Sequence, residues 1–203
     1  EAILPAGTTG ESATLTDDEQ ARVIEIVADQ ARKRAKIIAG AGANSTAKAI
    51  ALAIRARSAG ADAILSVAPY YNKPTQEGYF QHYRAIAEAV DAEIIVYNVP
   101  GRTASNIEAE TTLRLADEIP SIAGIKEASG NFTQIMEILR NRGKGFGVWS
   151  GDDSITLPLT ALGADGVVSV VSNEAPRLFS DMVRLCLKGM FTEAGKIHFK
   201  LLP

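Results

Sequence analysis

Residues 94–127 carry the pattern that decides the fold: they start with Ile94-Ile-Val-Tyr-Asn-Val-Pro100 and end with Ile122-Ala-Gly-Ile-Lys-Glu127. Both runs are short and mostly apolar, as strands buried in a parallel sheet are. Residues 108–118, between them, have the apolar spacing of an amphipathic helix. The stretch therefore predicts two parallel strands that are joined by a crossover helix.

The same alternation runs along the whole chain. Each apolar run is followed by a stretch with helical spacing, which favours a parallel α/β fold. The predicted strands are residues 2–5, 36–39, 63–68, 93–97, 122–126, 147–150 and 166–171. The predicted helices are residues 17–34, a segment from 44 to 60, then 75–90, 108–118, 131–142, 153–162 and 175–187, with another segment from 190 onward.

Two of these helices show further signals. Thr16 and Glu19 form a capping-box pattern at the start of the first helix. Gly60 is a stop signal for the second. Apolar spacing in that second helix predicts one shared face, made of Ala47, Ile50, Ala51 and Ile54.

Polar residues at the strand ends favour a closed barrel, which periodicity alone does not separate from an open doubly wound sheet. One face of a barrel would bring these residues together. They are Thr8, Thr9, Asn44, Tyr70, Tyr71, Tyr97, Arg102, Lys126 and Asp152. Seven strands are visible and the chain opens almost inside the first, so we expect an α/β TIM (β/α)8 barrel that lacks its first strand.

The composition argues against several classes of protein. A chain of 203 residues, 46% hydrophobic and 22% charged, suffices for one globular domain. A net charge of -3 provides no basic field for nucleic acid. Cys186 is the only cysteine, so no intrachain disulfide forms. No apolar run approaches the roughly 20 residues of a membrane helix, and no signal-peptide pattern opens the chain. We therefore expect no membrane partner and a cytoplasmic location.

Lys126 is the candidate nucleophile. Period-two alternation puts Ala123 and Ile125 on one face of their strand and Gly124 and Lys126 on the other, which points inward in a barrel. Gly124 would leave space for a small ligand beside the lysine stem. An apolar interior disfavours the ammonium and increases the neutral amine that attacks a ketone. The alternative is a lysine that reaches solvent or pairs with Glu127.

Tyr97 closes the preceding strand and would place a phenol beside that amine, where it can move protons. The alternative is a core aromatic with a satisfied hydroxyl. The turn Gly7-Thr-Thr-Gly-Glu11 offers backbone amides for a carboxylate and hydroxyls for a proton relay. Arg102 would clamp a substrate carboxylate, or else be a solvated loop residue.

Other polar residues have a simpler interpretation. Asp152 and Asp153 are adjacent, but nothing in the sequence fixes their carboxylates as an acid/base pair, and a capping role is favoured. His82 and His198 lie in no metal-ligand pattern. We expect neither a metal nor another cofactor.

Five motifs in this order resemble the dihydrodipicolinate synthase / N-acetylneuraminate lyase family over nearly the whole chain. They are Gly7-Thr-Thr-Gly-Glu-Ser12, Pro69-Tyr-Tyr-Asn72, Tyr97-Asn-Val-Pro-Gly-Arg-Thr103, Gly124-Ile-Lys-Glu127 and Ser150-Gly-Asp-Asp153. The family has residues before the first visible strand and a longer C-terminal helical region. The resemblance thus implies a partial barrel over residues 1–187 and the start of the C-terminal helical region over residues 188–203.

The resemblance also implies a reaction. Lys126 would form a Schiff base with pyruvate, and the enamine would condense with L-aspartate 4-semialdehyde on the route to diaminopimelate and lysine. Thr8, Tyr71 and Tyr97 would form the proton relay, with Tyr71 reaching into a neighbouring subunit of a homotetramer. Substrate-binding groups would be Thr9 for the pyruvate carboxylate, Arg102 for the semialdehyde carboxylate, and the backbones of Gly151 and Val168 beside Lys126.

A regulatory lysine region is part of the same resemblance. Ser12, Ala13, Asn44 and Tyr70 match it, but Lys48 stands where sensitive relatives carry glutamate, and Asp17 and Gln20 replace histidines that some of them have. A like charge disfavours the ammonium of lysine, so we expect weak or absent inhibition.

Two alternatives remain from the sequence. The first is N-acetylneuraminate lyase or another pyruvate-dependent aldolase of the superfamily, against which the position of Arg102 argues. The second is a noncatalytic binding or assembly module that retains a barrel sequence.

Overall fold

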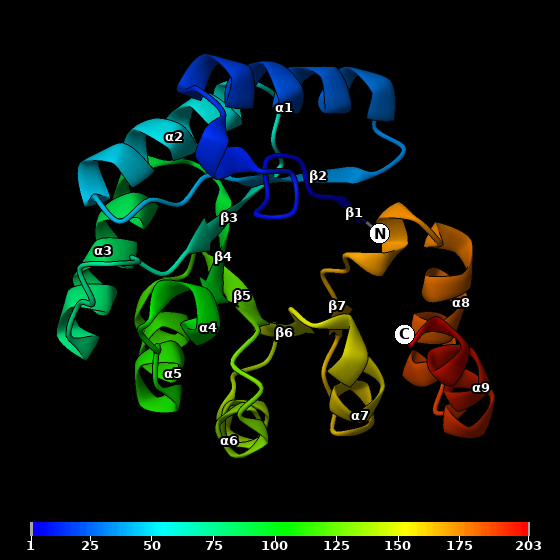
Figure 1. The fold of residues 1–203 in the computed structure, drawn as a ribbon. Coiled ribbons are helices and arrows are strands. Elements are labelled where there is room, and N and C mark those ends of the chain that lie inside the picture. Colours follow the sequence, from blue (N-terminus) through cyan, green and yellow to red (C-terminus); the bar gives the residue numbers. More distant parts are fainter. Residues whose placement is uncertain (1, 203) are drawn as a thin grey trace.

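The computed structural model describes residues 2–202, which contain one parallel sheet in the strand order β1-β2-β3-β4-β5-β6-β7. Figure 1 shows the sheet curling, with helices along its outer side. The strands are β1 (Ala2–Ile3), β2 (Lys36–Gly40), β3 (Ala63–Val67), β4 (Glu93–Asn98), β5 (Ile122–Glu127), β6 (Gly147–Ser150) and β7 (Gly166–Val167). All seven predicted strands are present, in a TIM-barrel-like arrangement whose described edges are β1 and β7. Both edge strands are shorter than predicted, because β1 ends at Ile3 and β7 ends at Val167.

The predicted helices are also present. They are α1 (Asp17–Ala31), α2 (Thr46–Ser58), α3 (Gln76–Ala89), α5 (Ala109–Glu118), α6 (Phe132–Asn141), α7 (Thr156–Ala161), α8 (Pro176–Leu187) and α9 (Phe191–Leu201). The predicted helix 153–162 starts with a 3-10 turn, η2 (Asp153–Ile155), before α7. Short elements that were not predicted are the helix α4 (Pro100–Thr103) and the 3-10 turns η1 (Ser12–Thr14) and η3 (Val171–Asn173). None of the helices within residues 2–202 is long and apolar enough to span a bilayer.

The start of α1 is as predicted. The Thr16 hydroxyl accepts a hydrogen bond from the Glu19 amide at 3.2 Å, and the Glu19 carboxylate accepts one from the Thr16 amide at 2.8 Å. The helix ends at Ala31, earlier than predicted, because Arg32 adopts a left-handed conformation with φ 47°.

The predicted face of α2 is wrong. Ile54 is 45% exposed, whereas the buried residues of the helix are Ala49, Leu52, Ala53 and Ala56. Alanine occupies both faces of this helix, so apolar spacing alone does not select one. Packing against the neighbouring α3 and β3 makes the choice.

The side chains on the two faces of the strands pack into two different parts of the core. Ile94, Val96 and Ile125 belong to the cluster under the helices. Tyr97 belongs to a second cluster with Ile95, inside the curl of the sheet. The predicted inward face of β4 and β5 is therefore confirmed for Tyr97 and Lys126.

Gly124 does not leave room for a ligand, contrary to expectation. A Cβ at this position would lie 2.3 Å from the Gly147 carbonyl oxygen and 2.5 Å from the Trp149 ring. The glycine instead lets β5, β6 and the indole approach each other closely. Gly151 is the glycine that lies against the lysine stem.

Candidate active site

Lys126 and Tyr97 lie side by side at the carboxyl ends of β5 and β4. They are register partners in the parallel pairing of the two strands. The Lys126 Nζ lies 4.0 Å from the centroid of the Tyr97 ring. Lys126 is 9% exposed and Tyr97 is 6% exposed, so the amine stands in an apolar, largely closed environment. The pair has the geometry of a cation–π contact when the amine is protonated.

Burial is the main cause that lowers the pKa of Lys126, from 10.5 to about 8. The negative charge of Asp153 opposes this shift, and the positive charge of Arg102 adds to it. The lowered pKa favours nucleophilic chemistry, because the neutral amine becomes abundant at a lower pH than for an exposed lysine.

The Tyr97 phenol stays protonated at the pH where the Lys126 amine becomes neutral. Burial raises the pKa of its phenol, while the Arg102 charge and a hydrogen bond with the Thr8 side chain lower it. Thr8 comes from the loop after β1, so the hydroxyls of two separate strand ends meet next to the amine. Such a chain of hydroxyls can deliver and remove protons.

A cavity of about 310 Å³ opens beside this pair. Its wall contains Thr8, Tyr97 and Arg102 from the predicted site and also Ser12, Ala13, Lys48 and Tyr70 from the predicted lysine region. Members of both predicted residue sets thus line one cavity. Lys126 does not itself line the described wall of this cavity. Its amine lies over the ring of Tyr97, which does line the wall.

Gly151 packs against the lysine stem. A Cβ at Gly151 would lie 3.0 Å from the Lys126 Cε and 2.7 Å from the Ala128 Cβ. Its amide donates to the Glu127 carbonyl at 2.7 Å, and the Val168 amide donates to the Ser150 carbonyl at 2.9 Å. The predicted place of Gly151 beside Lys126 is thus present, with Val168 following the next strand along the sheet.

The substitution Gly151→Ala is expected to slow reaction at Lys126 about tenfold or more, because the added methyl displaces the amine or its strand end and small misplacements are costly. The rate of a covalent reaction at the amine measures this effect. Gly143→Ala is the matched control, since a Cβ there meets nothing within 4 Å. Equal rates for both variants would contradict the account.

Tyr71 and Thr9 are exposed, whereas Lys126 and Tyr97 are buried. Tyr71 is 89% exposed and has a left-handed backbone with φ 72°, which is uncommon for a residue other than glycine. Thr9 is exposed beside Thr8 on the loop after β1. The structure of the single chain therefore does not bring Tyr71 to Lys126.

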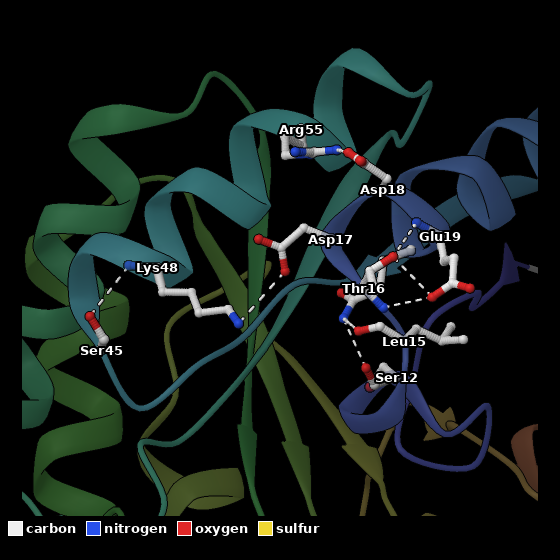
Figure 2. Close-up of polar contacts among 10 residues, drawn as sticks. Ser12, Leu15, Thr16, Asp17, Asp18, Glu19, Ser45, Lys48 and Arg55 are labelled. Atoms are coloured by element: carbon white, nitrogen blue, oxygen red, sulfur yellow. Dashed lines mark hydrogen bonds and ion pairs between the residues drawn. The ribbon is translucent and has the colours of Figure 1, made fainter.

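The predicted lysine region contains an ion pair between its own residues. The Lys48 Nζ lies 3.6 Å from an Asp17 carboxylate oxygen, as Figure 2 shows. The Gln20 side-chain amide (Nε2) donates to the Ser12 carbonyl at 2.8 Å. Asn44 is not in the described wall of the cavity; its carbonyl accepts a hydrogen bond from Asn72 at 3.1 Å.

Glu127 does not pair with Lys126, so that alternative for the lysine is wrong. Its carboxylate accepts hydrogen bonds from Asn98, Ser129 and Gln134 at 2.8 to 3.2 Å. Sequence analysis missed this group. A usable signal was present, because Asn98 and Glu127 directly follow Tyr97 and Lys126 and must face away from them.

The two adjacent aspartates have different contacts. Asp152 is the predicted cap: its carboxylate accepts from the Ser154 amide at 2.8 Å. Asp153 accepts from the amides of Val170 and Val171 at 2.9 and 3.0 Å. It is also the negative charge that acts on Lys126.

Neither histidine belongs to a metal cluster. Within residues 2–202, no group of three or more His, Cys, Asp and Glu side chains is arranged to hold a metal ion. The His82 Nδ1 lies 2.9 Å from the Thr46 hydroxyl, and burial lowers the His82 pKa to about 4.

The fold and the site together define a TIM-barrel-like α/β protein with a buried lysine amine stacked on a tyrosine at the carboxyl ends of its strands. Comparison with known sequences agrees with this description. The chain belongs to the dihydrodipicolinate synthetase family, whose sequence profile matches residues 1–203.

Individual relatives are similar over almost the entire chain. A 4-hydroxy-tetrahydrodipicolinate synthase from Chloroherpeton thalassium is 54% identical over 97% of this chain and 65% of its own length. The crystal structure of dihydrodipicolinate synthase from Aquifex aeolicus superposes with a TM-score of 0.97 at 47% identity, covering 99% of this chain and 69% of that one. The enzyme from Acinetobacter baumannii, solved in complex with pyruvate, gives a TM-score of 0.95 at 46% identity, with 98% and 68% covered. The chain thus spans about two thirds of the length of these relatives.

Proposed function

We propose that the protein has 4-hydroxy-tetrahydrodipicolinate synthase activity, a condensation of pyruvate with L-aspartate 4-semialdehyde in lysine and diaminopimelate biosynthesis. The observation that carries the proposal is the buried Lys126 amine, with its pKa lowered to about 8, over the ring of Tyr97. The printed names of the relatives support the substrate assignment.

The proposed reaction begins with the neutral Lys126 amine. It adds to the ketone carbon of pyruvate, and loss of water from the carbinolamine gives an iminium. Loss of a methyl proton then gives an enamine, whose carbon attacks the aldehyde carbonyl of the second substrate. The substrate's amine finally displaces Lys126 by transimination, which closes the ring and frees the enzyme. The covalent adduct lowers the cost of forming a carbanion equivalent.

Proton transfers in this sequence are assigned to Tyr97 and Thr8, which share a hydrogen bond. The phenol keeps its proton at neutral pH and can protonate the carbinolamine hydroxyl. Thr9, beside Thr8, is proposed to bind the pyruvate carboxylate. Gly151 and Val168 are proposed to line the adduct, and contact between Gly151 and the lysine stem supports this.

Tyr71 is proposed to complete the relay of a neighbouring subunit. Its 89% exposure and uncommon left-handed backbone support a role across an interface. Such a role requires at least a dimer, and we propose the homotetramer that the resemblance implies. A cytoplasmic location and the division between residues 1–187 and 188–203 stay predictions.

Inhibition by lysine is proposed to be weak or absent. Lys48 brings a positive charge to the cavity wall and already pairs with Asp17. A lysine ligand would meet this like charge with its own ammonium.

Arg102 provides the test of aldehyde choice. Removing its guanidinium in Arg102→Leu is expected to raise the KM for L-aspartate 4-semialdehyde by about 10- to 100-fold, since a hydrogen bond to a charged group contributes roughly 1.5 to 3 kcal/mol. Covalent reaction with pyruvate should continue, although the Lys126 pKa rises when the Arg102 charge is removed. Product formation, followed by mass spectrometry, measures the effect.

The wild-type chain is the reference for that experiment. Condensation with the semialdehyde, without cleavage of N-acetylneuraminate, supports the proposed activity. Cleavage of the sugar acid instead, or an unchanged KM in Arg102→Leu, would overturn the substrate assignment.

A further inference from the structure

A buried polar network lies directly behind the lysine–tyrosine pair. Asn98 and Glu127 each follow one member of the pair, at the last positions of β4 and β5, and they are register partners of each other. Both are 0% exposed. Because successive side chains of a strand alternate, this network is on the helix-facing side of the sheet, opposite the amine.

Glu127 is the point where the network converges. The Asn98 Nδ2 donates to both carboxylate oxygens at 3.2 Å, the Ser129 amide donates to one at 2.8 Å, and the Gln134 Nε2 donates to the other at 3.1 Å. Burial raises the pKa of Glu127, and these hydrogen bonds oppose that change. The donors therefore stabilise the ionised carboxylate in a place that otherwise disfavours it.

The backbone fixes the direction of every donor. The Asn98 Oδ1 accepts from the Ile107 amide at 3.1 Å, so its Nδ2 must face Glu127. The Gln134 Nε2 donates to the Ile107 carbonyl at 3.1 Å, so it too presents hydrogen to the carboxylate. Rotating either side-chain amide would break its bond to the backbone. Only an acceptor fits at the Glu127 position.

The same network reaches the loop that carries Arg102. Asn98 and Ile107 are the two ends of residues 98–107, and the Asn98 side chain bonds Asn106 as well as the Ile107 amide. One carboxylate thus connects the strand end of Tyr97, the strand end of Lys126 and both ends of the Arg102 loop. Charge-assisted hydrogen bonds of this kind are stronger than neutral ones and fix geometry.

We infer that Glu127 is a positioning residue for the proposed Schiff-base reaction: its ionised carboxylate holds Lys126, Tyr97 and the Arg102 loop in their reactive arrangement without touching substrate. The inference rests on the proposed function and adds to it a group outside the cavity wall.

The expected effect follows from what surrounds Lys126. Asp153 on η2 and Arg102 on α4 are the charges that act on its pKa, and Tyr97 on β4 covers it. Glu127 is on the other side and acts through placement. If the strand end loosens, water reaches the amine and the Lys126 pKa rises from about 8 toward 10.5.

The test is Glu127→Gln, which keeps the side-chain size but turns one acceptor into a donor that faces Asn98 and either Ser129 or Gln134. In the folded variant, we expect the rate of pyruvate adduct formation to fall about tenfold or more. We also expect the midpoint of its pH profile to move to higher pH. Adduct formation by the wild-type protein, measured first, tests the proposed function separately.

A matched control separates positioning from general loss of stability. Asp165 is a carboxylate at the opposite ends of the strands, and it accepts the Val148 amide at 2.8 Å. Asp165→Asn should lower thermal stability but leave the adduct rate and the pH midpoint unchanged. The inference is overturned if Glu127→Gln reacts like Asp165→Asn.

A milder variant keeps the test decisive if Glu127→Gln does not fold. Gln134→Met removes one donor to Glu127 and the bond to the Ile107 carbonyl, so a smaller shift in the same direction is expected. A folded Gln134→Met with the wild-type rate and pH midpoint would overturn the inference in that case.

Discussion

Replacing Lys126 with methionine is expected to abolish condensation while making the protein more stable. The methionine has a similar length but no nucleophile, so no Schiff base can form. Lys126 is 9% exposed and its pKa is about 8 instead of 10.5, which means that burial opposes its charged form. At roughly 1.4 kcal/mol per pH unit, this difference costs the folded state at most about 3 to 4 kcal/mol. We expect Lys126→Met to recover about 1 to 3 kcal/mol.

The pH dependence of that gain has a definite sign. Below about pH 8 the lysine is protonated in both the folded and unfolded states, so the cost is complete. As the pH rises from about 8 to 10.5, the folded state loses its proton first and the cost disappears. Denaturant unfolding should therefore show a larger gain in free energy of unfolding at about pH 7 than at about pH 9.5. Retained condensation, or a loss of stability at neutral pH, would contradict this account of Lys126.

Replacing Tyr97 with phenylalanine is expected to slow condensation by about 10²- to 10⁴-fold, the usual contribution of a general acid or base. The ring remains under the Lys126 amine, so the substitution removes the hydroxyl and its hydrogen bond with Thr8 but little of the packing. Steady-state kcat with both substrates measures the effect.

Tyr83→Phe is the control for Tyr97→Phe. Tyr83 is also buried, and its hydroxyl donates to the Ser66 carbonyl at 3.1 Å, away from the site. It should lose some stability and keep its kcat. A kcat for Tyr97→Phe within about threefold of the control would remove Tyr97 from the proton relay.

The sequence predicted the strands and the meeting of Tyr97 with Lys126 because both depend on local pattern, whereas the barrel was inferred from the polar residues at the strand ends. Period-two alternation and parallel pairing suffice to place two residues at neighbouring strand ends. The buried face of α2 was not predictable in this way. Alanines lie on both sides of this helix, so the apolar spacing fits either face equally well.

Other features depended on contacts between distant segments. The sequence predicts space for a ligand beside Gly124, whereas in the structure the Trp149 ring occupies this position. Glu127 looked like a possible partner for Lys126, but its actual partners Asn98 and Gln134 come from a neighbouring strand and a following helix. Tertiary packing decides such cases, and no short stretch of sequence contains it.

Reductive trapping shows whether Lys126 forms a Schiff base with pyruvate. The wild-type chain and Lys126→Ala are each incubated with pyruvate and borohydride, shown to be folded by circular dichroism, and measured by intact mass and peptide mapping. We expect one reduced pyruvyl adduct, mapped to Lys126 and missing in the variant. A folded wild-type protein without an adduct, or an adduct that persists in Lys126→Ala, would contradict this expectation.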